Sequence, residues 1–328
     1  MAREWLVAIS YPADDEFTKI NTGVLDGYAS VIFLDRRPED ERREILRQAD
    51  VLIGWHFEAE LPADAWQDLP RLRFVQLLSA GADALDFRAI PERLVLACNA
   101  GAYTAPIAEH VVAMALGLAR RLPQRHAALA RGEFGMWEPV ITLDGRICVI
   151  LGYGGIGAAT ARLMRAFGAR IQAVNTSGRT SDPTEFTGTL ADLDRVLAAA
   201  DVLVLSLPLT RATRGLIGAR ELSLMKPTAI LVNVSRAAVI DEGALYEHLR
   251  DQPEFGAGID TWWHEPGPDS GFSTAFPFFD LPNVIGSPHN SGTVDGALQT
   301  GARMAAENVR RFLRGEPVTG VIRREDYL

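Results

Sequence analysis

Three ionisable side chains follow successive β-like runs in the last third of the chain. Arg236 follows AILVNVS, Glu265 follows GIDTWWH and His289 follows NVIGSP. Ligands of open parallel sheets bind at the carboxyl ends of the strands, where all three are expected to lie. An arginine can bind a carboxylate through two N–H groups, and a histidine can exchange a proton near neutral pH beside an orienting carboxylate. The set suits hydride transfer to a 2-oxo acid.

Each of these residues also has a purely structural explanation. Arg236 could be a surface arginine, Glu265 a charge at a helix start, and His289 a hydrogen-bonded loop residue. Three of them at matching positions in consecutive strand units favour a catalytic set over three coincidences. We therefore expect Arg236, Glu265 and His289 to be the catalytic residues.

A glycine-rich turn lies upstream, between the β-like run RICVIL and the helical pattern AATARLMRAFG. Gly152 permits a tight turn, Gly154 lets the backbone approach a pyrophosphate, and Gly157 lets the helix pack closely on the strand. The helix then offers free N–H groups and its positive end to the phosphates. A dinucleotide is expected on this turn, whose residues are Gly152, Tyr153, Gly154, Gly155, Ile156 and Gly157.

The end of the next β-like run bears on the choice of dinucleotide. RIQAVN ends in Asn175, and Thr176, Ser177 and Arg179 follow. No carboxylate stands there to repel a 2′-phosphate, while hydroxyl groups and a guanidinium are available to bind one. This favours NADP over NAD. Two alternatives remain, that Asp182 approaches the ribose or that Arg179 is a solvated loop residue.

Composition excludes several classes of protein. The 328 residues carry a net charge of −9 and no long run of Lys and Arg, which argues against a nucleic-acid partner. The N-terminus does not resemble a signal peptide, and the apolar stretch 111–119 is too short to span a membrane. Cys98 and Cys148 lie in apolar runs and are expected to be buried free thiols, with no metal site. A cytoplasmic protein is expected.

Strand-like and helical patterns alternate in two series. The first third contains WLVAIS, VIFL, VLIG, RFVQLL and LVLAC, and the second series runs from RICVIL to NVIGSP. Such alternation predicts parallel, doubly wound sheets. Between the series, a helix is expected from a capping Thr104 to Arg121, ended by Pro123 and followed by an irregular stretch over 123–145. A last helix over about 294–314 adds no new strand series and is expected to fold back onto the first domain.

The chain as a whole resembles the D-isomer-specific 2-hydroxyacid dehydrogenases, and within them the glyoxylate and hydroxypyruvate reductases. The resemblance covers nearly the whole length. It is carried by LSAGADALDF, NAGAYTAPIAEHVVAMAL, LDGRICVILGYGGIGAATARLMRAFGA, LPLTRATRGLIG, LVNVSRAAVIDEGAL, GAGIDTWWHEP and LPNVIGSPHNSG. With the two strand series it predicts an α/β protein of two parallel-sheet domains. A Rossmann NAD(P)-binding domain, 104–292, is inserted into a flavodoxin-like substrate domain, 1–103 plus 293–328.

The resemblance also implies roles for individual residues. Arg236 would bind and polarise the substrate, and Glu265 and His289 would form the acid–base relay. Asp260 would hold the nicotinamide carboxamide, and the Ala80–Gly81 backbone would hold the substrate carboxylate. Further expected contacts are Trp55 for the substrate and Leu207, Pro208, Thr210, Val234 and Ser235 for the cofactor.

The expected substrate is a small 2-oxo or 2-hydroxy acid such as glyoxylate or hydroxypyruvate. A homodimer is implied, with residues 100–145 at its interface, where Trp137 could reach the neighbouring pocket. Trp262 and Trp263 either pack between the domains or shape the substrate pocket, and His110 is expected to make a structural hydrogen bond.

Individual features of the sequence bear on the alternatives within and beyond the family. Glu265 argues against a formate dehydrogenase, because that subgroup carries glutamine there. The length argues against a phosphoglycerate dehydrogenase with a regulatory domain. A non-catalytic, dinucleotide-sensing or corepressor-like protein on the same fold could retain the whole catalytic set, so this alternative remains open.

Overall fold

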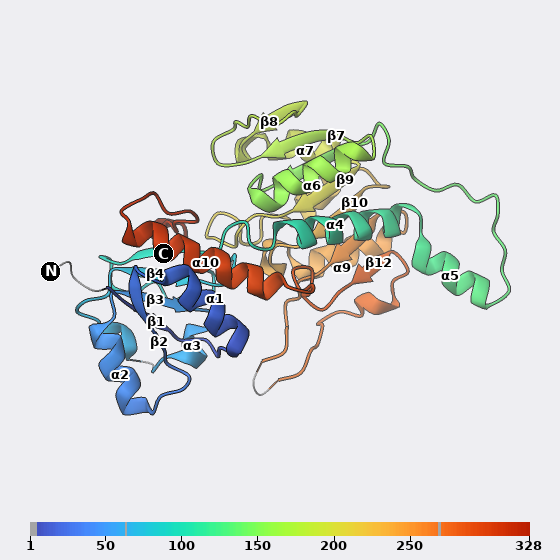
Figure 1. Cartoon of the computed structure of the whole chain (residues 1–328). Helices are drawn as coiled ribbons and strands as arrows, with labels where there is room; N and C mark the ends of the chain where they lie inside the picture. The colour runs from blue at the N-terminus through green and yellow to red at the C-terminus, as the bar shows by residue number, and fades with distance from the viewer. Residues whose placement is uncertain (1–4, 63, 268–269) are drawn as a thin grey trace. The chain divides into compact units, whose positions relative to one another are not determined.

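The chain folds into two compact units in this computed structural model, which describes residues 5–62, 64–267 and 270–328. One unit consists of Met1–Tyr103 and Val294–Leu328, and the other of Thr104–Thr293. The first is coloured blue and red in Figure 1, and the second green to orange. The second unit is thus an insertion in the chain of the first.

The first unit is built on a five-stranded parallel sheet of order β2-β1-β3-β4-β5. This is the flavodoxin-like strand order expected for that part of the chain. The middle strands β3 and β4 are buried along their whole length, and their residues are apolar apart from the buried Gln76 of β4. The strands are β1 (Trp5–Ile9), β2 (Ala29–Phe33), β3 (Val51–Gly54), β4 (Phe74–Leu77) and β5 (Val95–Ala97).

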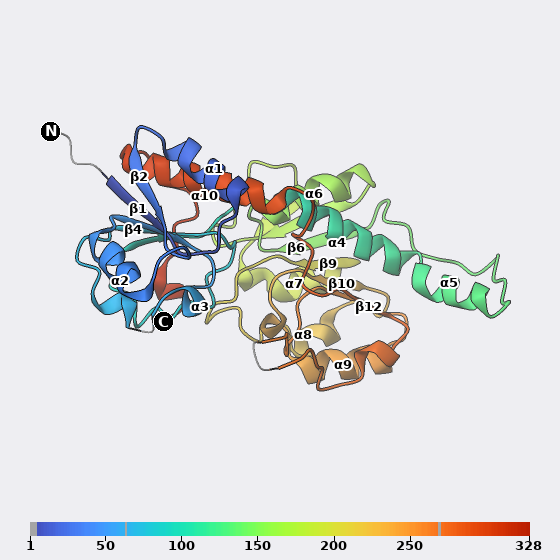
Figure 2. The same ribbon diagram turned by 60° about the horizontal axis from the view of Figure 1, so that its bottom comes forward.

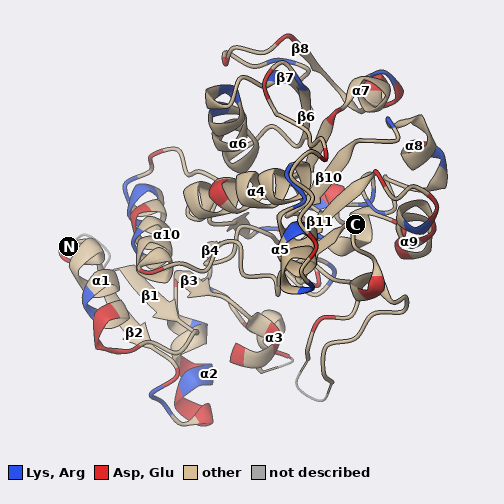
Figure 3. Cartoon of the chain, turned by 90° about the vertical axis from the view of Figure 1, so that its right-hand side faces the viewer, with Lys and Arg blue, Asp and Glu red and all other residues tan. Residues whose placement is uncertain are grey.

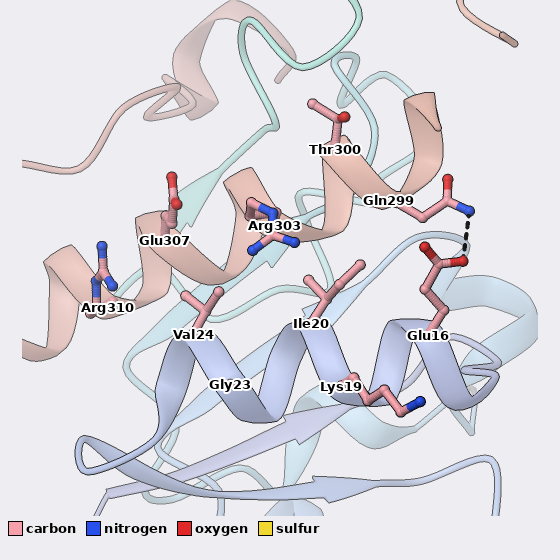
Figure 4. A pocket seen from close by; sticks show the side chains of 10 residues that line it. All are labelled: Glu16, Lys19, Ile20, Gly23, Val24, Gln299, Thr300, Arg303, Glu307 and Arg310. Carbon is pink, nitrogen blue, oxygen red and sulfur yellow. Dashed lines mark hydrogen bonds between the residues drawn. The ribbon is translucent and has the colours of Figure 1, made fainter. Parts of the chain in front are cut away.

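The last long helix of the chain, α10 (Ala297–Leu313), belongs to this first unit and packs beside α1 (Asp15–Leu25). In Figure 4, Ile20 and Val24 of α1 face α10, and Gln299 donates a 3.2 Å hydrogen bond to Glu16. A hollow of about 600 Å³ lies along this helix pair. None of the predicted site residues lines it. The unit is completed by α2 (Glu39–Gln48) and α3 (Phe57–Glu60).

The second unit contains a seven-stranded parallel sheet of order β12-β11-β10-β9-β6-β7-β8. The first strand of this unit, β6, pairs with the second, β7, on one side and with the fourth, β9, on the other. This is the arrangement of a dinucleotide-binding fold. The short strand β8 was not predicted, because FTG offers no apolar run. The strands are β6 (Ile147–Leu151), β7 (Arg170–Val174), β8 (Phe186–Gly188), β9 (Val202–Leu205), β10 (Ile230–Asn233), β11 (Gly256–Ile259) and β12 (Val284–Gly286).

Helices cover both faces of this sheet. Helix α4 (Thr104–Ala119) lies against α6 (Gly155–Ala166) and against β10 and β11, as Figures 1 and 2 both show. The other helices are α5 (Leu122–Ala130), α7 (Leu193–Ala199), α8 (Ala219–Leu224) and α9 (Glu242–Asp251). Within the described ranges, no helix has both the length and the apolar character needed to cross a membrane.

Two local expectations about this region were wrong. Thr104 does not cap α4 from outside, because the helix begins at Thr104 itself and its buried hydroxyl makes no hydrogen bond to the described residues. The stretch after Pro123 is not irregular throughout, because Pro123 lies in the first turn of α5, where its fixed φ and missing N–H are tolerated. Arg121, in the left-handed region at φ 48°, makes the corner between α4 and α5.

The segment from α5 to residue 137 exposes large apolar side chains. No residue of α5 is buried, and Phe134, Met136 and Trp137 are 74%, 63% and 90% exposed. An apolar surface of this kind is typical of a contact with another protein.

Charges are mixed rather than segregated on two helices of the first unit: basic and acidic segments alternate along α2 and α10 in Figure 3.

Candidate active site

The glycine turn lies between β6 and α6, and its geometry requires glycine at two positions. Gly152 has a φ of +93°, and a Cβ there would lie 2.6 Å from the Leu207 backbone nitrogen. A Cβ on Gly157 would lie 2.4 Å from the Gly152 carbonyl oxygen. Gly154 faces open space, because no atom lies within 4 Å of the position its Cβ would occupy. The backbone of the turn is therefore open to the approach of a ligand at Gly154.

Helix α6 begins at Gly155, with Gly154 as its N-cap and no side-chain hydrogen bond capping it. Its first N–H groups are consequently left for an external acceptor, as phosphate binding requires. Ser206, at the end of β9, donates 2.9 Å to the Gly152 carbonyl and fixes the turn from the other side. The residues present fit a dinucleotide pyrophosphate.

The loop after β7 is closed by its own polar side chains. The Asn175 Oδ1 accepts from the Ser177 backbone N–H at 3.1 Å and from its hydroxyl at 3.0 Å, and the Asn175 amide donates to the Arg179 carbonyl at 2.8 Å. The Tyr153 hydroxyl donates to Asp182 at 3.1 Å. Asp182 is thus engaged by the glycine turn, which the sequence did not reveal.

The segments after β9 and β10 lie on the same sheet edge. Leu207 adjoins the glycine turn, and Thr213 closes the Pro208–Thr210 segment by donating 2.6 Å to the Pro208 carbonyl. After β10, Val234 continues the strand by donating 3.2 Å to the Leu205 carbonyl. The Ser235 hydroxyl donates 2.7 Å to Asn233, whose amide donates 3.1 Å to the Arg236 carbonyl.

Glu265 and His289 form a direct pair. The His289 Nδ1 lies 2.8 Å from Glu265 Oε2, and since an ionised carboxylate only accepts, Nδ1 is the donor. The other oxygen, Oε1, accepts 2.9 Å from the Trp262 backbone N–H. His289 Nε2 is then the ring nitrogen that can exchange a proton with a substrate.

The charges around Glu265 keep it ionised. Burial raises the pKa of its carboxyl group, but the hydrogen bonds from His289 and from the Trp262 backbone, together with the positive charge of Arg236, outweigh burial and leave the pKa below its usual value. Arg236, Glu265 and His289 are thus brought into one electrostatic unit at the carboxyl ends of β10, β11 and β12.

Asp260 holds the loop that carries His289. Its side chain is fully buried, and its Oδ1 accepts from the Ser287 hydroxyl at 2.5 Å and from the Asn290 backbone at 3.2 Å. Its Oδ2 accepts from Ser291 at 3.3 Å, and its carbonyl accepts from the His289 backbone at 2.8 Å. These contacts show a loop-holding role, and the nicotinamide role implied by the resemblance stays a prediction.

His110 makes the structural hydrogen bond that was expected of it. Its Nε2 lies 2.9 Å from the Ser287 hydroxyl oxygen. Because that hydroxyl donates its one proton to Asp260, His110 must be the donor to Ser287. Ser287 was missed from the sequence. Its place two residues before His289, just after a strand, is the signal that could have identified it.

Trp262 and Trp263 pack inside the second unit. The Trp262 indole N–H donates 2.9 Å to the Ser287 carbonyl, and the Trp263 indole N–H donates 3.0 Å to the Ile240 carbonyl. Phe278 lies at the edge of the Trp262 ring and stacks on the Trp263 ring. Their contacts are thus with the core beneath the Glu265–His289 pair.

The predicted substrate residues of the first unit lie around one cavity. Trp55 and Gly81 line a space of about 330 Å³, next to Ala80, and the Trp55 ring stacks on His56 at 5.1 Å. Glu60 accepts from the backbone N–H groups of both aromatic residues and so fixes the end of β3. The cavity lies within this unit and is lined mostly by apolar side chains.

Comparison with known proteins places these features in one family. Residues 112–291 match the model of the D-isomer specific 2-hydroxyacid dehydrogenase NAD binding domain. The chain is 32% identical to a glyoxylate reductase of Thermococcus gammatolerans over 88% of this chain and 87% of that protein. It is also 33% identical to a glyoxylate reductase of Aeropyrum pernix, over 85% and 84%. The chain belongs to the D-isomer-specific 2-hydroxyacid dehydrogenase family.

A solved structure supports the same conclusion. The D-isomer specific 2-hydroxyacid dehydrogenase of Xanthobacter autotrophicus, solved in complex with NADPH and MES, is 26% identical with a TM-score of 0.80, covering 99% of this chain and 100% of that one. The protein is an oxidoreductase that acts on CH–OH groups with a nicotinamide dinucleotide. Its two parallel-sheet domains confirm the predicted fold class.

Proposed function

We propose that this protein reduces a small 2-oxo acid, of the glyoxylate or hydroxypyruvate kind, to the D-2-hydroxy acid with NADPH. The observation that carries the proposal is the Glu265–His289 pair at 2.8 Å beside Arg236. The names of the most similar relatives point to the same substrate class. The overall reaction consumes one 2-oxo acid, one NADPH and one proton, and yields the hydroxy acid and NADP⁺.

Each of the three residues has a defined task in this reaction. Arg236 binds the substrate carboxylate and polarises the neighbouring carbonyl. His289 donates a proton from Nε2 to the keto oxygen, and Glu265 holds the imidazole through Nδ1 and stabilises its charge. A bound nicotinamide supplies the hydride to the keto carbon. Trp55 and the Ala80–Gly81 backbone stay predicted substrate contacts.

The preference for NADP rests on the loop after β7. Arg179 and Ser177 follow the strand where an acid would favour NAD, and Asp182 is already engaged by Tyr153. A guanidinium and hydroxyl groups suit a 2′-phosphate. A homodimer also stays a prediction, favoured by the exposed apolar side chains between α5 and Trp137.

Replacing His289 by Asn tests the proposed function. Without a group that can donate the proton, kcat for 2-oxo acid reduction is expected to fall on the order of 1,000-fold. The oxidation of NADPH and NADH is followed by absorbance with glyoxylate, hydroxypyruvate and larger 2-oxo acids, and cofactor binding by fluorescence titration. Wild-type kcat in the variant would contradict the assignment. Cofactor binding by the wild-type protein without any turnover would instead favour a dinucleotide sensor.

A further inference from the structure

Trp262 connects the two strand ends that carry the catalytic pair. Its backbone N–H donates 2.9 Å to Glu265 Oε1, and its indole N–H donates 2.9 Å to the carbonyl oxygen of Ser287. Ser287 lies two residues before His289 and donates its hydroxyl to Asp260. Trp262 therefore contacts Glu265 through its backbone and the loop that carries His289 through its indole ring.

The indole is held tightly in this position. Trp262 is only 6% exposed, and its ring packs on Phe279, with the ring centres 5.1 Å apart. A Cβ on Gly286 would lie 2.7 Å from Trp262 Cζ2. The φ of Gly286 lies outside the left-handed region, so glycine is needed there for space. The absence of a side chain at the end of β12 lets the indole lie directly against the strand.

The His289 loop has a particular need for such support. His289 has a φ of +50°, in the left-handed region that costs free energy for a residue with a side chain. Such a conformation persists only where surrounding contacts determine it. Asp260 holds the loop from residue 287 to residue 291, and the Trp262 indole adds a bond at the carbonyl where the loop begins.

We propose that Trp262 is a positioning residue for proton transfer, which sets the distance between Glu265 and His289 by holding both strand ends. The proposal rests on the proposed function. The specific contribution is the indole N–H, because phenylalanine would fill a similar apolar space but leave the Ser287 carbonyl without this donor. The indole N–H donates to the Ser287 carbonyl and not to Glu265 or His289, so its effect on the pair is indirect.

The substitution Trp262→Phe tests this directly. We expect kcat to fall about tenfold, because a shift of the His289 loop misplaces the proton donor. The KM values for the 2-oxo acid and for NADPH are expected to change less than about twofold, because Trp262 is assigned no contact with either. A general loss of folded protein would also lower the apparent kcat at unchanged KM, so kcat is calculated per folded molecule, with the folded fraction taken from the stoichiometry of cofactor binding and from thermal unfolding.

Trp263→Phe is the matched control. It removes the same kind of bond, an indole N–H donating 3.0 Å to the Ile240 carbonyl, from a ring that also packs on Phe278. Trp263 does not bond to Glu265, Ser287 or His289 in the described structure. Its kcat is expected to stay within about twofold of wild type while its thermal stability falls as much as that of Trp262→Phe.

Gly286→Ala is a second test of the proposal, because it disturbs the position of the Trp262 ring without removing the indole N–H. The added methyl group must displace the Trp262 ring, so the same loss of kcat with unchanged KM is expected. Wild-type kcat in both Trp262→Phe and Gly286→Ala overturns the proposal, as does an equal loss in Trp263→Phe. His289→Asn distinguishes failure of the positioning role from failure of the proposed function: if His289→Asn is inactive while Trp262→Phe and Gly286→Ala both have wild-type kcat, only the positioning role fails. If His289→Asn is fully active, the proposed function fails.

Discussion

The carboxyl ends of β11 and β12 and the loop after β7 lie on the same edge of one sheet but are held in different ways. At β11 and β12, Asp260 is completely buried and bonds to residues 27 to 31 positions away. In the loop after β7, the side-chain hydrogen bonds of Asn175 reach no further than Arg179, four residues on. One region depends on the tertiary fold and the other is a locally closed turn.

This difference separates what the fold must preserve from what it can vary. Moving a proton needs groups placed to within a fraction of an ångström, and long-range bonds to a buried carboxylate provide that. Choosing between two dinucleotides needs only a charge at a solvent-exposed position. We therefore expect substitution of the buried Asp260 to change both activity and stability, and substitutions in the loop after β7 to change cofactor preference alone.

Among the substitutions that test this comparison, the largest effect is expected from Asp260→Asn. The amide replaces one acceptor oxygen by a donor that faces the N–H and O–H groups of the 287–291 loop, so buried donors lose their partner. The free energy of unfolding should fall by about 2–3 kcal/mol. The kcat should fall by about 10- to 100-fold. Urea unfolding and steady-state kinetics measure both, and a variant of wild-type stability would show that the loop does not depend on Asp260.

A smaller and different effect is expected from Arg179→Ala. Loss of a charge-assisted contact should lower the ratio of kcat/KM with NADPH to that with NADH by about tenfold. Unfolding should be unchanged, because the residue is in an exposed turn. Arg162→Ala, which removes an exposed arginine from α6, serves as the control and should leave the ratio unchanged. An unchanged ratio in Arg179→Ala would mean that this loop does not select NADP.

The smallest effect is expected from Asp201→Asn, at the opposite edge of the same sheet. Burial raises the pKa of the Asp201 carboxyl group, but the Ile147 backbone N–H and Lys226 outweigh burial, so the pKa is lowered overall. At pH 7 the variant should be less stable by about 1 kcal/mol, with kcat unchanged.

The pH dependence of that difference follows from the sign of the shift. A carboxyl group whose pKa is lowered by folding stabilises the protein above its unfolded-state pKa of about 3.9, and this contribution disappears as the pH falls through the lowered folded-state pKa. The gap between Asp201→Asn and wild type should therefore narrow below pH ~4. Urea unfolding at pH 7, 5 and 3.5 measures it, and a gap independent of pH would rule out the ion pairs as its origin.

The same contrast explains which features could be predicted from sequence. Apolar runs identified the strands, and the positions of Arg236, Glu265 and His289 after three of them indicated a common site. The strand β8 was missed because three residues carry too little pattern, and α5 because Pro123 was taken as an end rather than a beginning. Contacts such as that between His110 and Ser287, 177 residues apart, exist only after folding. No local pattern of sequence encodes them.

The left-handed backbone at His289 has a consequence for how this site can be maintained over evolution. Asparagine is among the side chains that tolerate that conformation best, so His289→Asn should unfold at the same temperature as wild type or a higher one. Selection for stability alone would then not retain the histidine. Only continued demand for turnover would, and a copy of the gene released from that demand could lose catalysis by one substitution while remaining a well-folded dinucleotide-binding protein.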